Sequence, residues 1–160
     1  MVKAVRYPPH GIRGVGAALA RATRWNSIPN YYATAHENIC LLIQVESVTG
    51  IENLDDILKI EGIDGIFIGA VDLSATMGYE GNPNHPEVQK VVVDAIQRIR
   101  AAGKAAGILS TQHEATQQYL DLGTEFVAVG VDTSVLMNAL RHLLAQYKQD
   151  VNVNSAQGGY

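Results

Sequence analysis

The sequence lacks the features that mark secreted, membrane-spanning or nucleic-acid-binding proteins. It holds a single cysteine, Cys40, so no disulfide can form within the chain. No apolar run reaches the roughly 18–20 residues that a membrane-spanning helix needs, and the first residues lack the apolar core of a signal peptide. The 12 Lys and Arg residues are scattered and outnumbered by 16 Asp and Glu, leaving no basic patch for phosphate backbones or anionic lipids. We therefore expect a cytoplasmic protein with no nucleic-acid and no membrane partner.

The residues that are abundant indicate a packed α/β domain. Hydrophobic residues make up 47% of the 160, enough for a continuous core. Four short apolar runs, at 39–45, 65–69, 105–109 and 126–131, predict strands that are buried on both faces. Helical patterns with a 3.6-residue period alternate with these runs and end the chain. This alternation predicts a parallel sheet of four βα units.

Local signals set several boundaries. Gly62, Gly103 and Gly123 each follow the last periodic residue of a helical pattern, where a left-handed cap residue is favoured. Pro86, preceded by His85, predicts the start of a helix. Before the first strand we expect an extended Tyr-Pro-Pro segment and a helix over 17–25. Cys40 falls inside the first apolar run, which predicts a buried and unreactive thiol.

The number of βα units is small for a closed barrel. A (β/α)₈ barrel needs about 200–250 residues, so four units correspond to about half of one. We expect a partial barrel domain over 1–147 and a flexible polar tail over 148–160.

Two carboxylates follow the first two predicted strands. In parallel α/β folds the functional groups collect at the carboxyl ends of the strands, and Glu46 and Asp72 occupy such positions on consecutive strands. Together they predict a hard-oxygen site for Mg²⁺ or Mn²⁺. The alternative is that both only cap the following helices, and the spacing alone favours that more common role.

The turn after the second strand offers a second kind of site. Backbone N–H groups near Val71 and Asp72 are placed to bind a carboxylate without a basic side chain, although an ordinary strand-to-helix turn explains the segment as well. The five histidines have no metal-ligand spacing, and the sequence has no dinucleotide fingerprint, Walker A loop or serine nucleophile elbow.

Five segments match a known family in order and spacing. They read YPPHGIRGVG from Tyr7, LIQVES from Leu42, EGIDGIFIG from Glu61, DLS from Asp72 and FVAVGVD from Phe126. The chain thereby resembles the HpcH/HpaI class II aldolases up to its tail. The resemblance implies strands five to eight of a (β/α)₈ barrel and homo-oligomers, typically hexamers.

The resemblance also implies an activity. Members of this family cleave 4-hydroxy-2-oxo acids to pyruvate and an aldehyde, with a divalent metal (Mg²⁺, Mn²⁺ or Co²⁺) instead of a Schiff-base lysine. The chain looks most like members that cleave 4-hydroxy-2-oxoheptane-1,7-dioate to pyruvate and succinic semialdehyde in aromatic catabolism. The alternatives are an aldolase for 2-keto-3-deoxy sugar acids, a truncated half-barrel that binds metal and pyruvate without turnover, and an unrelated flavodoxin-like binding domain.

Individual residues match the family's site. Glu46 and Asp72 match its metal ligands, Gln44 matches a substrate contact, the backbone of Val71 and Asp72 matches the amides that hold the pyruvyl carboxylate, and Leu109 matches a position in the aldehyde pocket. The chain has Ala-Val at 70–71 where the family usually has Pro-Ala. The family's general-base histidine and keto-polarising arginine lie upstream of the matched segments, so no catalytic residue is assigned here.

Overall fold

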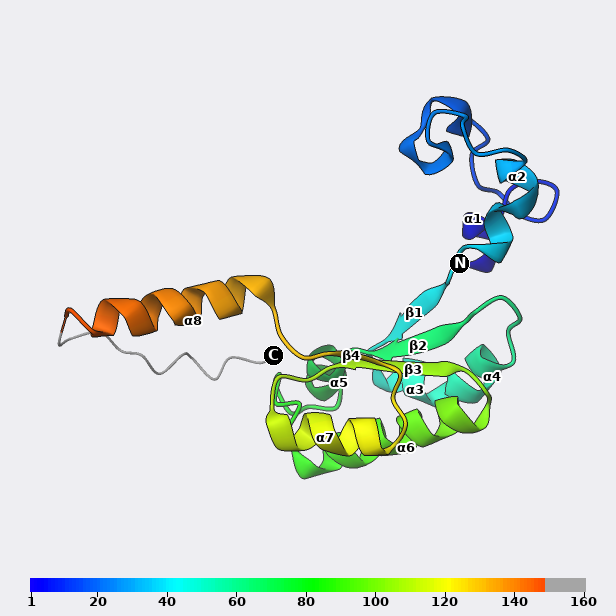
Figure 1. Ribbon diagram of the computed structural model, residues 1–160. Coiled ribbons are helices and arrows are strands. Elements are labelled where there is room, and N and C mark those ends of the chain that lie inside the picture. The colour runs from blue at the N-terminus through cyan, green and yellow to red at the C-terminus, as the bar shows by residue number, and fades with distance from the viewer. Residues whose placement is uncertain (149–160) are drawn as a thin grey trace. The chain divides into compact units, whose positions relative to one another are not determined.

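The computed structural model describes residues 1–148 (Figure 1). The chain divides into two compact units, one of Met1–Leu42 with Glu61–Asp64, and one of Ile43–Ile60 with Gly65 onward. Among the described residues, no helix is long and apolar enough to cross a membrane. The tail expected over 148–160 lies, except for its first residue, outside the described part.

The first unit consists of short helical turns around a tyrosine cluster. Tyr7 packs edge-on against Tyr31 and Tyr32, and the Arg13 guanidinium lies 4.6 Å from the centroid of the Tyr7 ring. The turns are α1 (Val2–Val5), η1 (Ala17–Leu19), η2 (Arg21–Thr23), α2 (Tyr31–Thr34) and η3 (Ala35–Glu37). The Tyr-Pro-Pro segment is a turn rather than extended chain, because the His10 amide donates to the Tyr7 carbonyl at 3.0 Å.

The prediction of a helix over 17–25 is wrong. Two 3₁₀ turns, η1 and η2, replace it. The Thr23 hydroxyl donates to the carbonyls of Ala17 (2.7 Å) and Ala20 (3.0 Å), so a side chain competes with helical backbone bonds. Arg24, Trp25 and Asn26 then follow with φ of 48°, 53° and 66°, which ends any right-handed helix.

The second unit contains the sheet, whose strand order is β1-β2-β3-β4. The strands are β1 (Leu42–Val45), β2 (Gly65–Ile68), β3 (Ala105–Leu109) and β4 (Phe126–Ala128). Strands β2 and β3 run parallel with Ile68 opposite Ile108, and β3 and β4 run parallel with Leu109 opposite Ala128. The predicted α/β fold with a parallel sheet is confirmed.

Helices α6 and α7 lie along one face of this sheet (Figure 1). The helices are α3 (Val48–Glu52), α4 (Leu54–Leu58), α5 (Ala70–Thr76), α6 (Pro86–Ala101), α7 (His113–Asp121) and α8 (Asp132–Ala145). Gly103 and Gly123 directly follow the C-caps of α6 and α7 with φ of 73° and 84°, as predicted. The cap prediction is wrong for Gly62, which has φ of 84° but lies in a separate turn three residues beyond Lys59, the C-cap of α4. Helix α6 begins at Pro86, and the His85 side chain accepts a hydrogen bond from the Glu87 amide.

The core lies between the sheet and α6. Ile66, Ile68 and Ile108 are almost fully buried, as are four apolar residues of α6, namely Val88, Val92, Ile96 and Ile99. The opposite face is less covered: Leu42 of β1 is 38% exposed and Phe126 of β4 is 52% exposed. The expectation of four strands buried on both faces is therefore wrong for β1 and β4, since the helices packed on the sheet leave that face open.

Cys40 is exposed, which corrects the prediction of a buried thiol. Regular strand structure begins only at Leu42. The preceding residue, Leu41, pairs with Asp64: the Leu41 amide donates to the Asp64 carboxylate at 2.6 Å, and the Asp64 amide donates to the Leu41 carbonyl at 2.9 Å. Leu41 is buried and its neighbour Cys40 faces solvent.

Candidate functional site

Gln44 and Glu46 form a hydrogen-bonded pair at the carboxyl end of β1. The two residues are separated by one position, and side chains with that spacing in an extended chain point to the same face. The Gln44 amide Nε2 donates to Glu46 Oε2, and both side chains are exposed. This pair unites two of the residues predicted to form the site.

Glu46 does not cap the helix that follows it. The N-cap of α3 is Ser47, whose hydroxyl accepts from the Gly50 amide at 3.1 Å. The helix-capping alternative is therefore wrong for Glu46, whose carboxylate is left available at the strand end.

The next strand comes close to this pair at Gly69. The Gly69 amide donates to the Val45 carbonyl at 3.0 Å, which joins the ends of β1 and β2. A Cβ placed on Gly69 would lie 2.6 Å from the Cβ of Glu46 and 2.8 Å from Gln44 Nε2. Such distances are shorter than atoms tolerate, so this approach requires glycine.

Asp72 lies in the first turn of α5, directly after this contact. Gly69 is the N-cap of α5, and its carbonyl accepts the first helical bond, from the Leu73 amide at 2.9 Å. The amides of Val71 and Asp72 precede that bond and belong to the unpaired N–H groups of a helix start. Asp72 is exposed, and its position also suits a carboxylate that stabilises the helix dipole. Helix α5 starts at Ala70 without the family's proline.

Leu109 is the last residue of β3, at the same carboxyl-terminal end of the sheet. Ile108 pairs with Ile68 of β2, so Leu109 and Gly69 each follow one member of that pair. Leu109 is half-buried. The five predicted residues thus sit at the carboxyl ends of three neighbouring strands, and only Gln44 and Glu46 have their side chains in a hydrogen bond with each other.

The carboxylates at this end of the sheet are of a kind that suits a hard divalent cation. Within residues 1–148, neither Glu46 nor Asp72 forms an ion pair with Lys, Arg or His, so both carboxylates keep their charge uncompensated. The described residues contain no group of three or more His, Cys, Asp or Glu side chains that could hold a metal ion. Two carboxylates suit Mg²⁺ or Mn²⁺, which bind few protein ligands and keep positions for water and substrate oxygens. The residues present fit such an ion.

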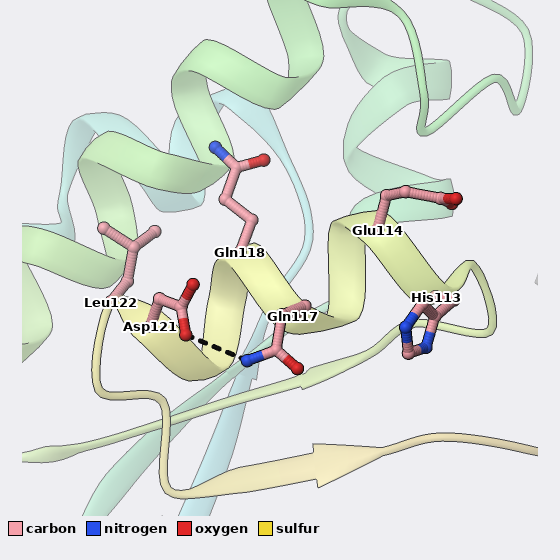
Figure 2. Close-up of a pocket in the computed structure, with 6 residues that line it drawn as sticks. All are labelled: His113, Glu114, Gln117, Gln118, Asp121 and Leu122. Carbon is pink, nitrogen blue, oxygen red and sulfur yellow. Dashed lines mark hydrogen bonds between the residues drawn. The ribbon is translucent and has the colours of Figure 1, made fainter.

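A separate pocket of about 500 Å³ lies on the surface of α7 (Figure 2). Five residues of α7 and Leu122 line it, and Gln117 Nε2 donates to Asp121 Oδ1 at 2.9 Å. None of the predicted site residues is among them. The pocket is therefore distinct from the candidate site.

Comparison with known proteins finds similarity to one enzyme family. Residues 1–139 match the family model described as HpcH/HpaI aldolase/citrate lyase. The chain is 59% identical over 156 residues to the hydroxypyruvate/pyruvate aldolase of Pseudomonas aeruginosa, covering 98% of this chain and 58% of the relative. It is 54% identical over 160 residues to a 2-keto-3-deoxy-L-rhamnonate aldolase of Escherichia coli O1:K1, covering all of this chain and 60% of the relative. The chain thus spans about three fifths of the length of these relatives.

Solved structures of related proteins have a similar fold. A HpcH/HpaI aldolase/citrate lyase family protein from Burkholderia cenocepacia J2315 superimposes with a TM-score of 0.83 at 32% identity, over 91% of this chain and 58% of that one. The citrate synthase SbnG superimposes with a TM-score of 0.77 at 28% identity, over 92% and 56% of the two chains.

Proposed function

Because the chain belongs to the HpcH/HpaI aldolase/citrate lyase family, we propose that it is the metal-binding part of a class II pyruvate aldolase. The observation that carries the proposal is the strand-end arrangement in which Glu46, held by Gln44, stands beside the turn that leads to Asp72. HpcH/HpaI aldolases are a (β/α)₈ barrel family, and we propose that the four βα units here correspond to strands five to eight of that barrel.

The proposed reaction is the retro-aldol cleavage of a 4-hydroxy-2-oxo acid. The C4 hydroxyl loses its proton, the bond between C3 and C4 breaks to give an aldehyde, and the electron pair remains on the pyruvate enolate, which then takes a proton at C3. Glu46 and Asp72 would hold a divalent ion, which would supply Lewis-acid stabilisation of the negative charge that develops on the substrate oxygens. No residue of this chain matches the family's general base, so none is assigned that role.

The chain's own residues would bind and orient the substrate. The amides of Val71 and Asp72 precede the helical hydrogen bonds of α5 and are suited to the pyruvyl carboxylate. The Ser74 hydroxyl donates to the Val71 carbonyl at 2.6 Å, and buried Ser74 thereby fixes the turn that presents these amides. Gln44 is proposed to contact the substrate from β1, and Leu109 to form an apolar part of the aldehyde pocket.

Among possible aldehydes, those derived from sugar acids are favoured. The two relatives above are named for hydroxypyruvate with pyruvate and for 2-keto-3-deoxy-L-rhamnonate. Both names fit the 2-keto-3-deoxy sugar acid alternative better than cleavage of 4-hydroxy-2-oxoheptane-1,7-dioate. We therefore propose 2-keto-3-deoxy sugar acids, whose cleavage releases hydroxylated aldehydes, as the substrate class.

The test is pyruvate release by the purified chain. The chain is incubated with 2-keto-3-deoxy-L-rhamnonate or 4-hydroxy-2-oxoheptane-1,7-dioate, with Mn²⁺ and with a chelator. The proposal predicts Mn²⁺-dependent turnover that is faster with the sugar acid, or Mn²⁺ and pyruvate binding without turnover if the proton-transfer groups are not among these residues. Neither turnover nor binding would refute it.

A further inference from the structure

We propose that Gly69 and Gln44 act together as positioning residues for the Glu46 carboxylate. Gly69 leaves the space that the Glu46 side chain occupies, and the Gln44 amide holds one of its two oxygens. This inference rests on the proposed function, because the ligand that the positioned carboxylate serves is the divalent cation of the aldolase.

The backbone of Gly69 does not itself require glycine. Its φ of −85° and ψ of 80° keep φ on the negative side, which residues with side chains adopt. The requirement is for space. An added Cβ would meet the Glu46 Cβ at 2.6 Å and Glu46 Oε2 at 2.8 Å.

Glu46 cannot simply move away from such a Cβ. The residue before it, Val45, is buried and accepts the Gly69 amide at 3.0 Å, so the two strand ends are tied at the point of contact. The residue after it, Ser47, caps α3. The Glu46 Cβ is therefore fixed from both sides, and an alanine at 69 must displace the backbone or the carboxylate.

The Gln44 amide fixes the carboxylate in a second way. It donates to Oε2, which leaves Oε1 as the oxygen without this donor. An added Cβ at 69 would lie 2.8 Å from Gln44 Nε2. That amide is the end of a flexible side chain and can rotate away, but only by giving up its bond to Glu46. Hydrogen bonds of this kind to a ligating carboxylate commonly change metal affinity by about 10–100-fold.

Gly107 provides a matched control on the same sheet. It pairs with Phe67 of β2, and a Cβ there would meet the Phe67 ring at 2.9 Å and the Phe126 carbonyl at 3.2 Å. Gly107→Ala therefore crowds a strand glycine as Gly69→Ala does, but against aromatic and backbone atoms rather than against Glu46.

The experiment is a Mn²⁺ titration of the full chain, followed by the electron paramagnetic resonance signal of free Mn²⁺. Wild type, Gly69→Ala, Gln44→Ala and Gly107→Ala are compared, and circular dichroism reports their folding. We expect Gly69→Ala and Gln44→Ala each to weaken Mn²⁺ binding by about 10–100-fold. Gly107→Ala should lose stability while its Mn²⁺ affinity stays within about twofold of wild type, a contrast that a purely structural role of Gly69 does not produce.

The contrary outcomes are distinct. A folded Gly69→Ala that binds Mn²⁺ as wild type does would overturn the inference and leave the proposed metal site standing. If Gly69→Ala does not fold, Gln44→Ala decides, and wild-type affinity in that variant overturns the inference. Failure of the wild-type chain to bind Mn²⁺ would instead remove the metal site itself, and the positioning role with it.

Discussion

The Gln44 amide donates a hydrogen bond to the carboxylate of Glu46 at the end of β1, and the adjoining strand end approaches both side chains at a glycine. This relationship gives the strand end a held carboxylate without a cationic partner among residues 1–148. Both the stability of this strand end and its affinity for a cation can be measured.

Removing the cap of α3 should destabilise the segment that follows Glu46. Ser47→Ala deletes the hydroxyl that accepts the Gly50 amide, and losing such a cap costs about 0.5–2 kcal/mol. Denaturant unfolding should show this loss, while Ser47→Asp, which can also cap, should retain most of the stability. Equal stability of Ser47→Ala and wild type would show that the cap contributes little.

The contact between α6 and α7 depends on a buried tyrosine. The Tyr119 hydroxyl donates to Gln89 Oε1 at 2.7 Å, and Gln89 Nε2 in turn donates to the Pro83 carbonyl at 2.7 Å. Tyr119→Phe leaves the Gln89 oxygen without its donor, so the free energy of unfolding at pH 8 should fall by about 1 kcal/mol. A fall no larger than that of Tyr147→Phe, an exposed control, would contradict the assigned hydrogen bond.

The same tyrosine should give a pH dependence at alkaline pH. Burial raises the pKa of Tyr119 above its ordinary value of 10.0, so the folded state favours the protonated phenol. Its stabilising contribution is complete below the unfolded pKa and is lost as pH rises through the folded pKa. The stability difference between wild type and Tyr119→Phe should therefore shrink above pH of about 10, as measured by urea unfolding at a series of pH values. A constant difference would mean that Tyr119 titrates equally in both states.

Metal removal should lower thermal stability. A cation that binds only the folded state stabilises it by RT ln(1 + [L]/Kd), or about 2.7 kcal/mol at 100 times Kd. Melting should therefore shift upward with Mn²⁺ and return on addition of a chelator. The shift should be absent in Asp72→Asn, and an equal shift in that variant would place the stabilising ion elsewhere.

The sequence predicts the elements whose signals are local. The glycines at 103 and 123 adopt the left-handed conformation expected directly after a helix, and Pro86 begins α6. The strands β2 and β3 follow from their apolar runs because both lie under α6 and are buried.

The predictions that are wrong concern segments whose structure involves a side-chain hydrogen bond or a residue distant in the sequence. The helix expected over 17–25 fails because Thr23 bonds to backbone carbonyls. Cys40 is exposed and precedes Leu41, whose amide donates to Asp64, 23 residues away along the chain. Neither interaction is visible in a hydrophobic pattern.

For the site, the sequence predicts that Glu46 and Asp72 follow the carboxyl ends of two strands, and the structure has them there. The sequence does not predict their surroundings. The bond between Gln44 and Glu46 was accessible from the two-residue period of a strand. The need for glycine at 69 was not, because it comes from contact between two strands separated by 23 positions, from Glu46 to Gly69. A glycine directly after an apolar run was the available signal.

Mn²⁺ binding by Glu46→Gln and Asp72→Asn tests the central claim most directly. Each substitution keeps the size of the side chain and removes a charged ligand, and Glu52→Gln on neighbouring α3 serves as the exposed carboxylate control. The account predicts that the wild-type chain and Glu52→Gln bind Mn²⁺ alike, while each of the other two loses at least about tenfold in affinity. Unchanged affinity in both Glu46→Gln and Asp72→Asn would contradict it.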